Sequence, residues 1–223
     1  MIIEKVLSAE QCKNVHTALG TVRWIDGKST AGAVAGAVKD NEQVDLKEAR
    51  GAQLAQELSI AIGSHMTMRA AALPKRVSAL RISRTQKGGH YGVHFDNALM
   101  PAKDGIMRTD LSFTLFLSAP DSYDGGELVV YDSQQEMRHK LPAGDLVLYP
   151  SGALHEVTPV TRGARIACVG WVQSVVSRAD QRTALWELHQ LSKELQKRLG
   201  VQDKQTRLAQ KIYADLVRQF SEI

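Results

Sequence analysis

The segment Asp110–Ser118, with the sequence DLSFTLFLS, is the clearest indication of the fold in this chain. The odd positions of the segment are all large and apolar: Leu111, Phe113, Leu115 and Leu117. The even positions between them are Ser112, Thr114 and Phe116. A period of two places alternate side chains on opposite faces of a β-strand. We therefore predict a strand that buries its leucine face in a core.

Further strand-like segments lie on both sides of this one. They are RVSALRISR (76–84), GGELVVYD (125–132), GDLVLYP (144–150) and ARIACVGWVQS (164–174). Glycine and proline turns separate them, and no helical pattern intervenes. Several short strands within about 100 residues favour an all-β sandwich or barrel over a doubly wound parallel sheet.

The two ends of the chain have a helical pattern instead. Ser8 and Gln11 form a capping-box pair before a short helix, and residues 44–65 have the spacing of a long amphipathic helix. The last 45 residues contain a leucine stripe that Gly200 ends, followed by a second helix. We predict an N-terminal helical region (1–74), a β core (75–175) and a C-terminal helical region (176–223). The leucine stripe favours packing on the core and also allows a homo-oligomer.

Composition excludes several classes of protein. The chain has 223 residues, 43% hydrophobic and 23% charged, and its net charge of +4 is spread along the sequence. Dispersed lysines and arginines give no reason to expect a nucleic-acid partner. No apolar run reaches the length of a membrane span and the N-terminus lacks a signal-peptide pattern, so we expect a cytoplasmic protein with no membrane partner. Cys12 and Cys168 are too few and too far apart for a disulfide framework or a zinc ribbon.

The pair His94 and Asp96 lies two residues apart in the segment His90–Met100, HYGVHFDNALM. Side chains two apart in a strand share a face, so an imidazole nitrogen and a carboxylate oxygen can converge on one metal ion. Such a pair recurs by chance, and a metal site needs a third ligand. His90 is the near rival, but its backbone adjoins the Gly88-Gly89 turn.

His155 is the stronger candidate for the third ligand. It follows the bend at residues 150–152 and opens a new strand, which the segment 161–163 is expected to turn back as a hairpin. In that hairpin His155 and Arg165 would be diagonal neighbours on one face. A buried arginine is costly without a counter-charge, so Arg165 needs either a local acid or an anionic ligand.

Two histidines and one carboxylate form the facial triad of non-heme Fe(II) oxygenases, which leaves positions open for a cosubstrate and O₂. The segment 148–174, LYPSGALHEVTPVTRGARIACVGWVQS, together with HYGVHFDNA, DLSFTLFLS and DGGELVVYD, resembles the PKHD-type hydroxylases. These are bacterial Fe(II)/2-oxoglutarate dioxygenases related to prolyl and lysyl hydroxylases. The resemblance extends to WIDGKSTAGAVAGAVKDN (24–41) and to the helical tail, so it covers most of the chain.

The resemblance implies a fold, a site and an activity. The fold would be a double-stranded β-helix, or jelly roll, with flanking helices. One Fe(II) per subunit would bind to His94, Asp96 and His155, and Arg165 would bind the 2-oxoglutarate carboxylate. The enzyme would use O₂ to hydroxylate an amino-acid, peptide or small-molecule C–H bond with release of succinate and CO₂, and L-ascorbate would keep the iron reduced.

Other residues near these motifs carry weaker expectations. Tyr91 would contact the cosubstrate in related enzymes, although its parity is opposite to that of His94 unless Gly92 distorts the strand. Tyr149 and Trp171 are expected to pack in the core, and Asn97 is equally consistent with a place beside the site or away from it. Trp24 and the small-residue segment TAGAVAGAV (30–38) could cover the mouth of the site.

Three other functions use similar residues. A cupin-like iron-binding or sensing protein would hold the metal without turnover, but it would have no reason to bury Arg165. A nucleic-acid demethylase should have a basic face with stacking aromatics, and aromatic residues are only 5% of this chain. A zinc hydrolase could use the same triad, but no general base stands beside it in the sequence.

Overall fold

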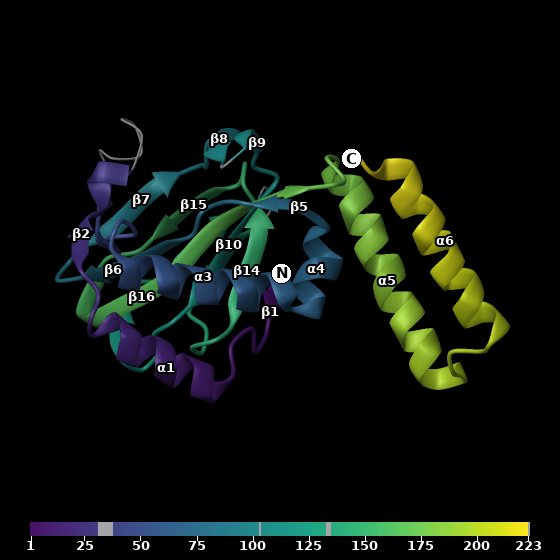
Figure 1. Ribbon diagram of the computed structural model, residues 1–223, viewed down its shortest axis with the longest axis horizontal. Coiled ribbons are helices and arrows are strands. Elements are labelled where there is room, and N and C mark those ends of the chain that lie inside the picture. Colours follow the sequence, from purple (N-terminus) through teal and green to yellow (C-terminus); the bar gives the residue numbers. More distant parts are fainter. Residues whose placement is uncertain (31–37, 103, 133–134, 223) are drawn as a thin grey trace.

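In the computed structural model, two antiparallel β-sheets face each other, and helices cover the outer side of the larger one (Figure 1). The structure describes residues 1–30, 38–102, 104–132 and 135–222. The mainly β architecture with helices at both ends is the one that the sequence predicts. The space between the two sheets is where the candidate site lies.

Within the described residues, the larger sheet has nine strands. Its main path runs β1 (Ile2–Ile3), β14 (Leu146–Pro150), β10 (Leu111–Phe116), β16 (Val160–Ser174), β6 (Arg81–Gln86), β4 (Glu42–Val44) and β2 (Trp24–Asp26). Two more strands, β11 (Tyr123–Gly125) and β5 (Pro74–Val77), pair with the two ends of β16. The long strand β16 is thus the centre of this sheet.

The smaller sheet lies opposite and has five strands within the described residues. Its order is β13 (Glu136–His139), β12 (Leu128–Tyr131), β15 (Leu154–Val157), β7 (His90–His94) and β3 (Lys39–Asp40). A separate hairpin consists of β8 (Leu99–Ala102) and β9 (Gly105–Arg108).

Helices pack on the outer face of the larger sheet. The helical elements are α1 (Ala9–Leu19), the 3₁₀ helix η1 (Gly27–Thr30), α3 (Ala49–Ser64), α4 (Met66–Ala72), α5 (Ala179–Leu199) and α6 (Lys204–Phe220). The predicted capping box begins α1, where Ser8 and Gln11 each bond the other's backbone N–H. Residues 1–74 also supply β1 to β4, which the sequence does not reveal because strands of two or three residues are too short to show a period.

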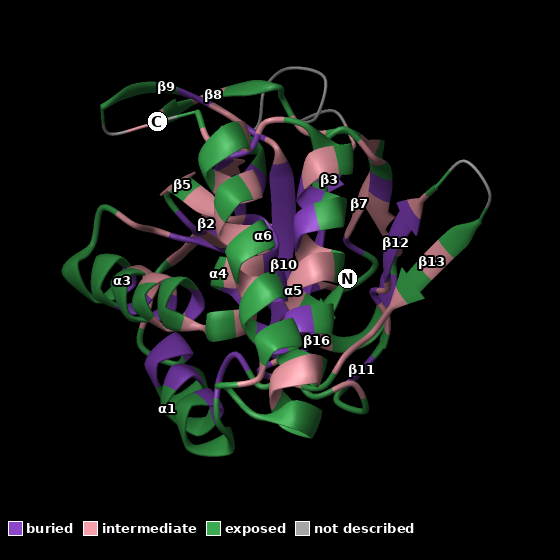
Figure 2. Ribbon diagram, turned by 90° about the vertical axis from the view of Figure 1, so that its right-hand side faces the viewer, coloured by how far each residue is buried: buried purple, intermediate pink, exposed green. Residues whose placement is uncertain are grey.

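The segment 110–118 explains how the two layers share one strand. Leu111, Phe113 and Leu115 face the helices in the main core, whereas Ser112, Thr114 and Phe116 face the smaller sheet. Both faces of β10 are buried, as the purple ribbon at the centre of Figure 2 shows. The polar positions on the inner face are therefore inside the protein rather than at its surface, which makes them available to a site.

The predicted hairpin between His155 and Arg165 is wrong. Residues 160–174 form one continuous strand, and β15 pairs with β12 and β7 while β16 pairs with β10 and β6. The chain therefore crosses from one sheet to the other after Val157 instead of turning back. His155 and Arg165 face each other across the sandwich, and Gly163, with φ +70°, lies inside the strand opposite Tyr123.

The C-terminal helices α5 and α6 form an antiparallel hairpin that stands beside the sandwich, and α5 contacts α4 (Figure 1). Gly200 ends α5, as predicted. Of the helices in the described ranges, none is long and apolar enough to cross a membrane. The proposed cover segment 30–38 lies almost entirely outside the described residues. Trp24 packs under the Arg84 guanidinium at 4.3 Å and does not line the cavity.

Candidate iron and 2-oxoglutarate site

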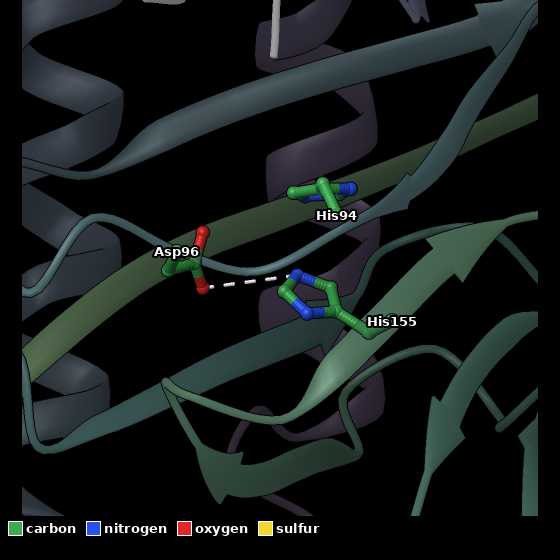
Figure 3. A group of neighbouring side chains, drawn as sticks. All are labelled: His94, Asp96 and His155. Atoms are coloured by element: carbon green, nitrogen blue, oxygen red, sulfur yellow. Dashed lines mark ion pairs between the residues drawn. The ribbon is translucent and has the colours of Figure 1, made fainter. Parts of the chain in front are cut away.

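The three predicted metal ligands converge between the sheets, where ligand atoms of His94, Asp96 and His155 all lie within 4.8 Å of one another (Figure 3). His94 is the last residue of β7, and His155 lies directly opposite it on the paired strand β15. The Nε2 atom of His155 is 3.7 Å from Asp96 Oδ2. Within the described ranges this is the one group of three such side chains at that spacing. The rival His90 is outside it.

Both imidazoles are held with the same nitrogen toward the centre of this group. His94 Nδ1 lies 2.7 Å from the Gly92 carbonyl oxygen, and His155 Nδ1 lies 2.9 Å from that of Ala153. A carbonyl only accepts, so each Nδ1 carries the proton and donates. In the neutral imidazole this leaves the Nε2 lone pair free, which is the tautomer that binds a metal.

Asp96 reaches the same centre from outside a strand. β7 ends at His94, so the pleat does not align the two side chains as the sequence argument assumed. Instead the Asp96 N–H donates to the Ser151 carbonyl oxygen at 3.2 Å, and the Ser112 hydroxyl donates to Oδ2 at 2.6 Å. Ser112 Oγ is also 2.8 Å from Ser151 Oγ. The carboxylate is therefore positioned by the β10 strand and the 150–152 bend.

Tyr91 joins the group because the pairing of β7 with β15 is irregular. His94 pairs with His155, but Val157 pairs with Tyr91, so three steps on β7 match two on β15. This bulge brings Tyr91 and His94 to one face in spite of their odd spacing. Their rings stack with centroids 3.7 Å apart. The structure thus places Tyr91 beside the three candidate ligands, as the distortion near Gly92 would require.

Arg165 lies on the opposite wall of the same cavity, which has a volume of about 490 Å³. It is only 2% exposed, and its Nε and Nη2 atoms have no hydrogen-bond partner within the described part of the chain. Phe116 lies against the guanidinium, with the ring centroid 5.4 Å from Cζ. Burial lowers the pKa of Arg165. A buried guanidinium whose N–H donors lack acceptors favours the binding of an anion, because burying an unpaired charge costs several kcal/mol of folding free energy.

The electrostatics around the triad favour a metal over protons. Burial, and then the neighbouring His155, lower the pKa of His94 to about 4, so that its imidazole is neutral at pH 7. Burial, and then the Asp96 charge, raise the pKa of Tyr91 to about 12. Burial also raises the pKa of Tyr149. The Tyr149 ring packs edge-on against the His155 ring, with centroids 5.1 Å apart. Both tyrosines are therefore neutral hydrogen-bonding groups at the site.

Several cavity residues have a different place from the one expected, or no sequence signal at all. Tyr149 and Trp171 are buried in the core as predicted, and both also line the cavity. Asn97 lines it as well. Ser112 looked like an ordinary polar position of an amphipathic strand, and only its pairing opposite Trp171 and its contact with Asp96 reveal its role.

Two comparisons of sequence point in one direction. A family model described as the 2OG-Fe(II) oxygenase superfamily matches residues 80–173. The chain is 45% identical over 222 residues to the PKHD-type hydroxylase YbiX of Shigella dysenteriae serotype 1, and equally to YbiX of Escherichia coli O1:K1. Each alignment covers 99% of this chain and 98% of the relative.

Solved structures share the fold at low sequence identity. A prolyl hydroxylase from Trichoplax adhaerens, in complex with a hypoxia inducible factor peptide fragment, has a TM-score of 0.58 at 18% identity and covers 83% of this chain and 86% of its own. HygX from Streptomyces hygroscopicus, with nickel, 2-oxoglutarate and hygromycin B bound, has a TM-score of 0.54 at 12% identity over 79% and 84% of the two chains. The prediction of a double-stranded β-helix with flanking helices is thereby confirmed.

Proposed function

The chain belongs to the PKHD-type hydroxylases of the 2OG-Fe(II) oxygenase superfamily, and on that premise we propose which of its residues carry the reaction. It is a 2-oxoglutarate-dependent dioxygenase that hydroxylates a substrate with release of succinate and CO₂. We assign one Fe(II) per subunit to His94, Asp96 and His155. We assign the distal carboxylate of 2-oxoglutarate to Arg165, with Tyr91 beside it.

The donor set fits Fe(II) and a chelating cosubstrate. Two neutral imidazoles and one carboxylate are the ligands that non-heme Fe(II) uses, and three protein ligands leave positions for 2-oxoglutarate and O₂. When bound, the iron and its cosubstrate supply the oxygen chemistry, in which one atom of O₂ enters a C–H bond and the other enters succinate. The observation that carries the assignment is Arg165, since its idle buried donors face the cavity that also holds the triad.

The chain's own residues orient and isolate the reaction. Arg165 offers two donors to one carboxylate, and this fixes the cosubstrate at the end of the cavity where Arg165 lies. Ser112 holds Asp96, and the Gly92 and Ala153 carbonyls hold the two imidazoles, so the ligands need little reorganisation when metal binds. Phe116, Leu128 and Tyr149 wall this end from water.

An anaerobic titration tests the assignment. We expect 2-oxoglutarate added to the Fe(II)-loaded protein to produce the visible metal-to-ligand charge-transfer band of its chelate. His94→Ala should remove the band, whereas His90→Ala, four residues earlier on the same strand, should leave it unchanged. Saturating 2-oxoglutarate without a band in the wild-type protein would overturn the assignment and favour an iron-binding protein without turnover.

The substrate, the reductant, the location and the oligomeric state stay predictions. We expect an amino-acid, peptide or small-molecule substrate and no nucleic acid, because the basic residues are dispersed. L-Ascorbate as reductant, a cytoplasmic location and a homo-oligomer through the C-terminal leucines are predictions of the sequence and the resemblance. We also propose the division into residues 1–74, 75–175 and 176–223.

A further inference from the structure

The cavity has a second cationic end, opposite Arg165. On β6, Thr85 pairs with Arg165 of β16, whereas Arg81 pairs with Val169. Arg81 comes four residues before Thr85, a distance of about 13 Å along the strand. From there the Arg81 guanidinium reaches Trp171, with Cζ 5.8 Å from the ring centroid. We call the region of Arg81 and Trp171 the outer end of the cavity, and the region of Arg165 the inner end.

Among the described residues, no acid pairs with Arg81 at the outer end. Its side chain is half-buried and lines the cavity, and no acidic side chain of the described ranges forms an ion pair or hydrogen bond with it. Arg84, on the other face of the same strand, shows the contrast, since it pairs with Glu42 at 2.9 Å. A guanidinium carries five N–H donors in a planar fork, and those of Arg81 are available to a ligand.

Trp171 adds a second available donor. Its ring lines the cavity and its Nε1 atom is buried without a hydrogen-bond partner in the part of the chain that the structure describes. An indole N–H donates and cannot accept. The outer end therefore offers N–H donors from two neighbouring side chains, a combination that suits an acceptor with two oxygens, such as a carboxylate.

The charge balance of the cavity indicates an anion as well. Its described lining includes the cations Lys39, Arg81 and Arg165, and Asp96 is the one acid. Fe(II) and the 2-oxoglutarate dianion offset each other, and Asp96 offsets one of the two arginines, so that the charge of the other arginine stays. Lys39 lies 5.4 Å from the centroid of the Tyr91 ring, and burial together with the Arg81 charge lowers its pKa to about 8. An anionic group between the sheets would relieve this repulsion.

We propose that the substrate carries a carboxylate, which Arg81 binds as a bidentate pair at the outer end while the C–H bond to be hydroxylated faces the triad. The inference rests on the proposed function, because it takes the inner end as the cosubstrate site. Phe95 also lines the cavity, and its ring is 65% exposed and offers apolar contact to the rest of such a substrate. The substrate class is thus an apolar carboxylic acid, such as an N-acylated amino acid or a peptide C-terminus.

The test uses matched acids and amides as probes. Protein is loaded anaerobically with Fe(II) and saturating 2-oxoglutarate, and N-acetyl-L-proline, N-acetyl-L-leucine and N-acetyl-L-lysine are titrated against their primary amides. Perturbation of the chelate band reports occupation of the cavity without turnover. We expect at least one acid to act at a tenfold lower concentration than its amide. In Arg81→Gln this preference should disappear, and Arg81→Lys should keep part of it.

Two controls separate the outcomes. Arg84→Gln makes the same change on the other face of β6 and should behave as wild type. In Arg81→Gln the 2-oxoglutarate concentration that half-saturates the band should change less than twofold. The proposal is overturned if no acid perturbs the band, if the amides act equally well, or if Arg81→Gln keeps the preference. A rise in the 2-oxoglutarate requirement would instead place Arg81 in the cosubstrate site. Failure of the proposed function is distinct, because then 2-oxoglutarate alone gives no band.

Discussion

Replacement of Arg165 by methionine should stabilise the protein and at the same time disable it. Arg165 is 2% exposed and two of its nitrogens lack partners within the described residues, so the fold bears the cost of a desolvated charge. Methionine keeps an unbranched stem of similar length and removes that charge. Exchanges of buried charged groups for apolar side chains of similar volume stabilise proteins by about 1–4 kcal/mol.

The expected gain is toward the middle of that range. The contact with the Phe116 ring, 5.4 Å from Cζ, is lost, and such contacts contribute about 0.5–2 kcal/mol. A net stabilisation of about 2 kcal/mol in the absence of 2-oxoglutarate corresponds to a rise in Tm of roughly 4–8 °C for a chain of this size. The effect on the ligand has the opposite sign. Loss of two charge-assisted hydrogen bonds should weaken 2-oxoglutarate binding by about 3 kcal/mol or more, at least about 100-fold.

Thermal unfolding of the metal-loaded protein under anaerobic conditions measures both effects. At 2-oxoglutarate equal to 100 times its Kd, the wild-type protein should gain about 2.7 kcal/mol, and the Arg165→Met variant almost none. Arg182→Met is the matched control, because Arg182 is also buried, at 7% exposed, but donates to the Val176 and Ser177 carbonyls at 2.8 and 2.7 Å. That variant should lose about 1–3 kcal/mol of stability and keep the ligand response.

Two results would refute the reasoning. If Arg165→Met unfolds several degrees below wild type without ligand, Arg165 stabilises the empty fold and its donors are not idle. If the variant keeps the 2-oxoglutarate response, the carboxylate binds elsewhere in the cavity. In the latter case the assignment of the inner end is wrong, and a titration of the same variant with Fe(II) alone tests metal binding at the triad separately.

Three further predictions concern other parts of the site. Ser112→Ala removes the 2.6 Å hydrogen bond to the metal-binding carboxylate and should weaken Fe(II) or Co(II) binding about 10–100-fold in a metal titration; an unchanged affinity would contradict the positioning role. Lys39→Met should raise the free energy of unfolding at pH 7 by an amount of order 1 kcal/mol, and Tm with it. The reason is that burial lowers the pKa of the ammonium to about 8, against 10.5 in the unfolded chain. Since the fold disfavours the charged form, this difference should be full below pH 8 and shrink as the pH rises toward 10.5; a difference that grows over that range would refute it. Gly126 has φ +64°, and the Cβ of Gly126→Ala would lie 3.1 Å from Arg165 Cδ. This variant should lower stability by about 1 kcal/mol and raise the 2-oxoglutarate concentration required for binding. Gly152→Ala, whose Cβ would meet nothing within 4 Å, should do neither.

Most of the strands and the three side chains of the candidate metal site were predictable because their signals are local. The period-two pattern of apolar residues in 110–118 is visible within nine residues. It predicts a strand without any knowledge of the strands that pair with it. Two histidines and an aspartate in these motifs are typical of a metal site. The family resemblance selects His94 and His155 from the seven histidines of the chain and adds Asp96. The identity of Arg165 follows in the same way.

Pairing between distant segments was not predictable. The sequence around Thr161 has the composition of a turn, yet residues 160–174 run on as one strand, because β11 and β6 supply partners on both sides of it. Likewise Tyr91 has the wrong parity for the site until β15 imposes a bulge on β7. These outcomes depend on which edges meet, and no local period encodes that.

The sequence by itself thus determined the β core, its helical flanks and the four residues proposed to hold Fe(II) and 2-oxoglutarate. Tertiary structure alone decided that His155 and Arg165 face each other across two sheets, that Ser112 holds Asp96, and that Arg81 stands unpaired at the outer end. The physical reason is that residue type and period act over a few neighbours, whereas burial and the presence of a counter-charge depend on segments far apart in the chain.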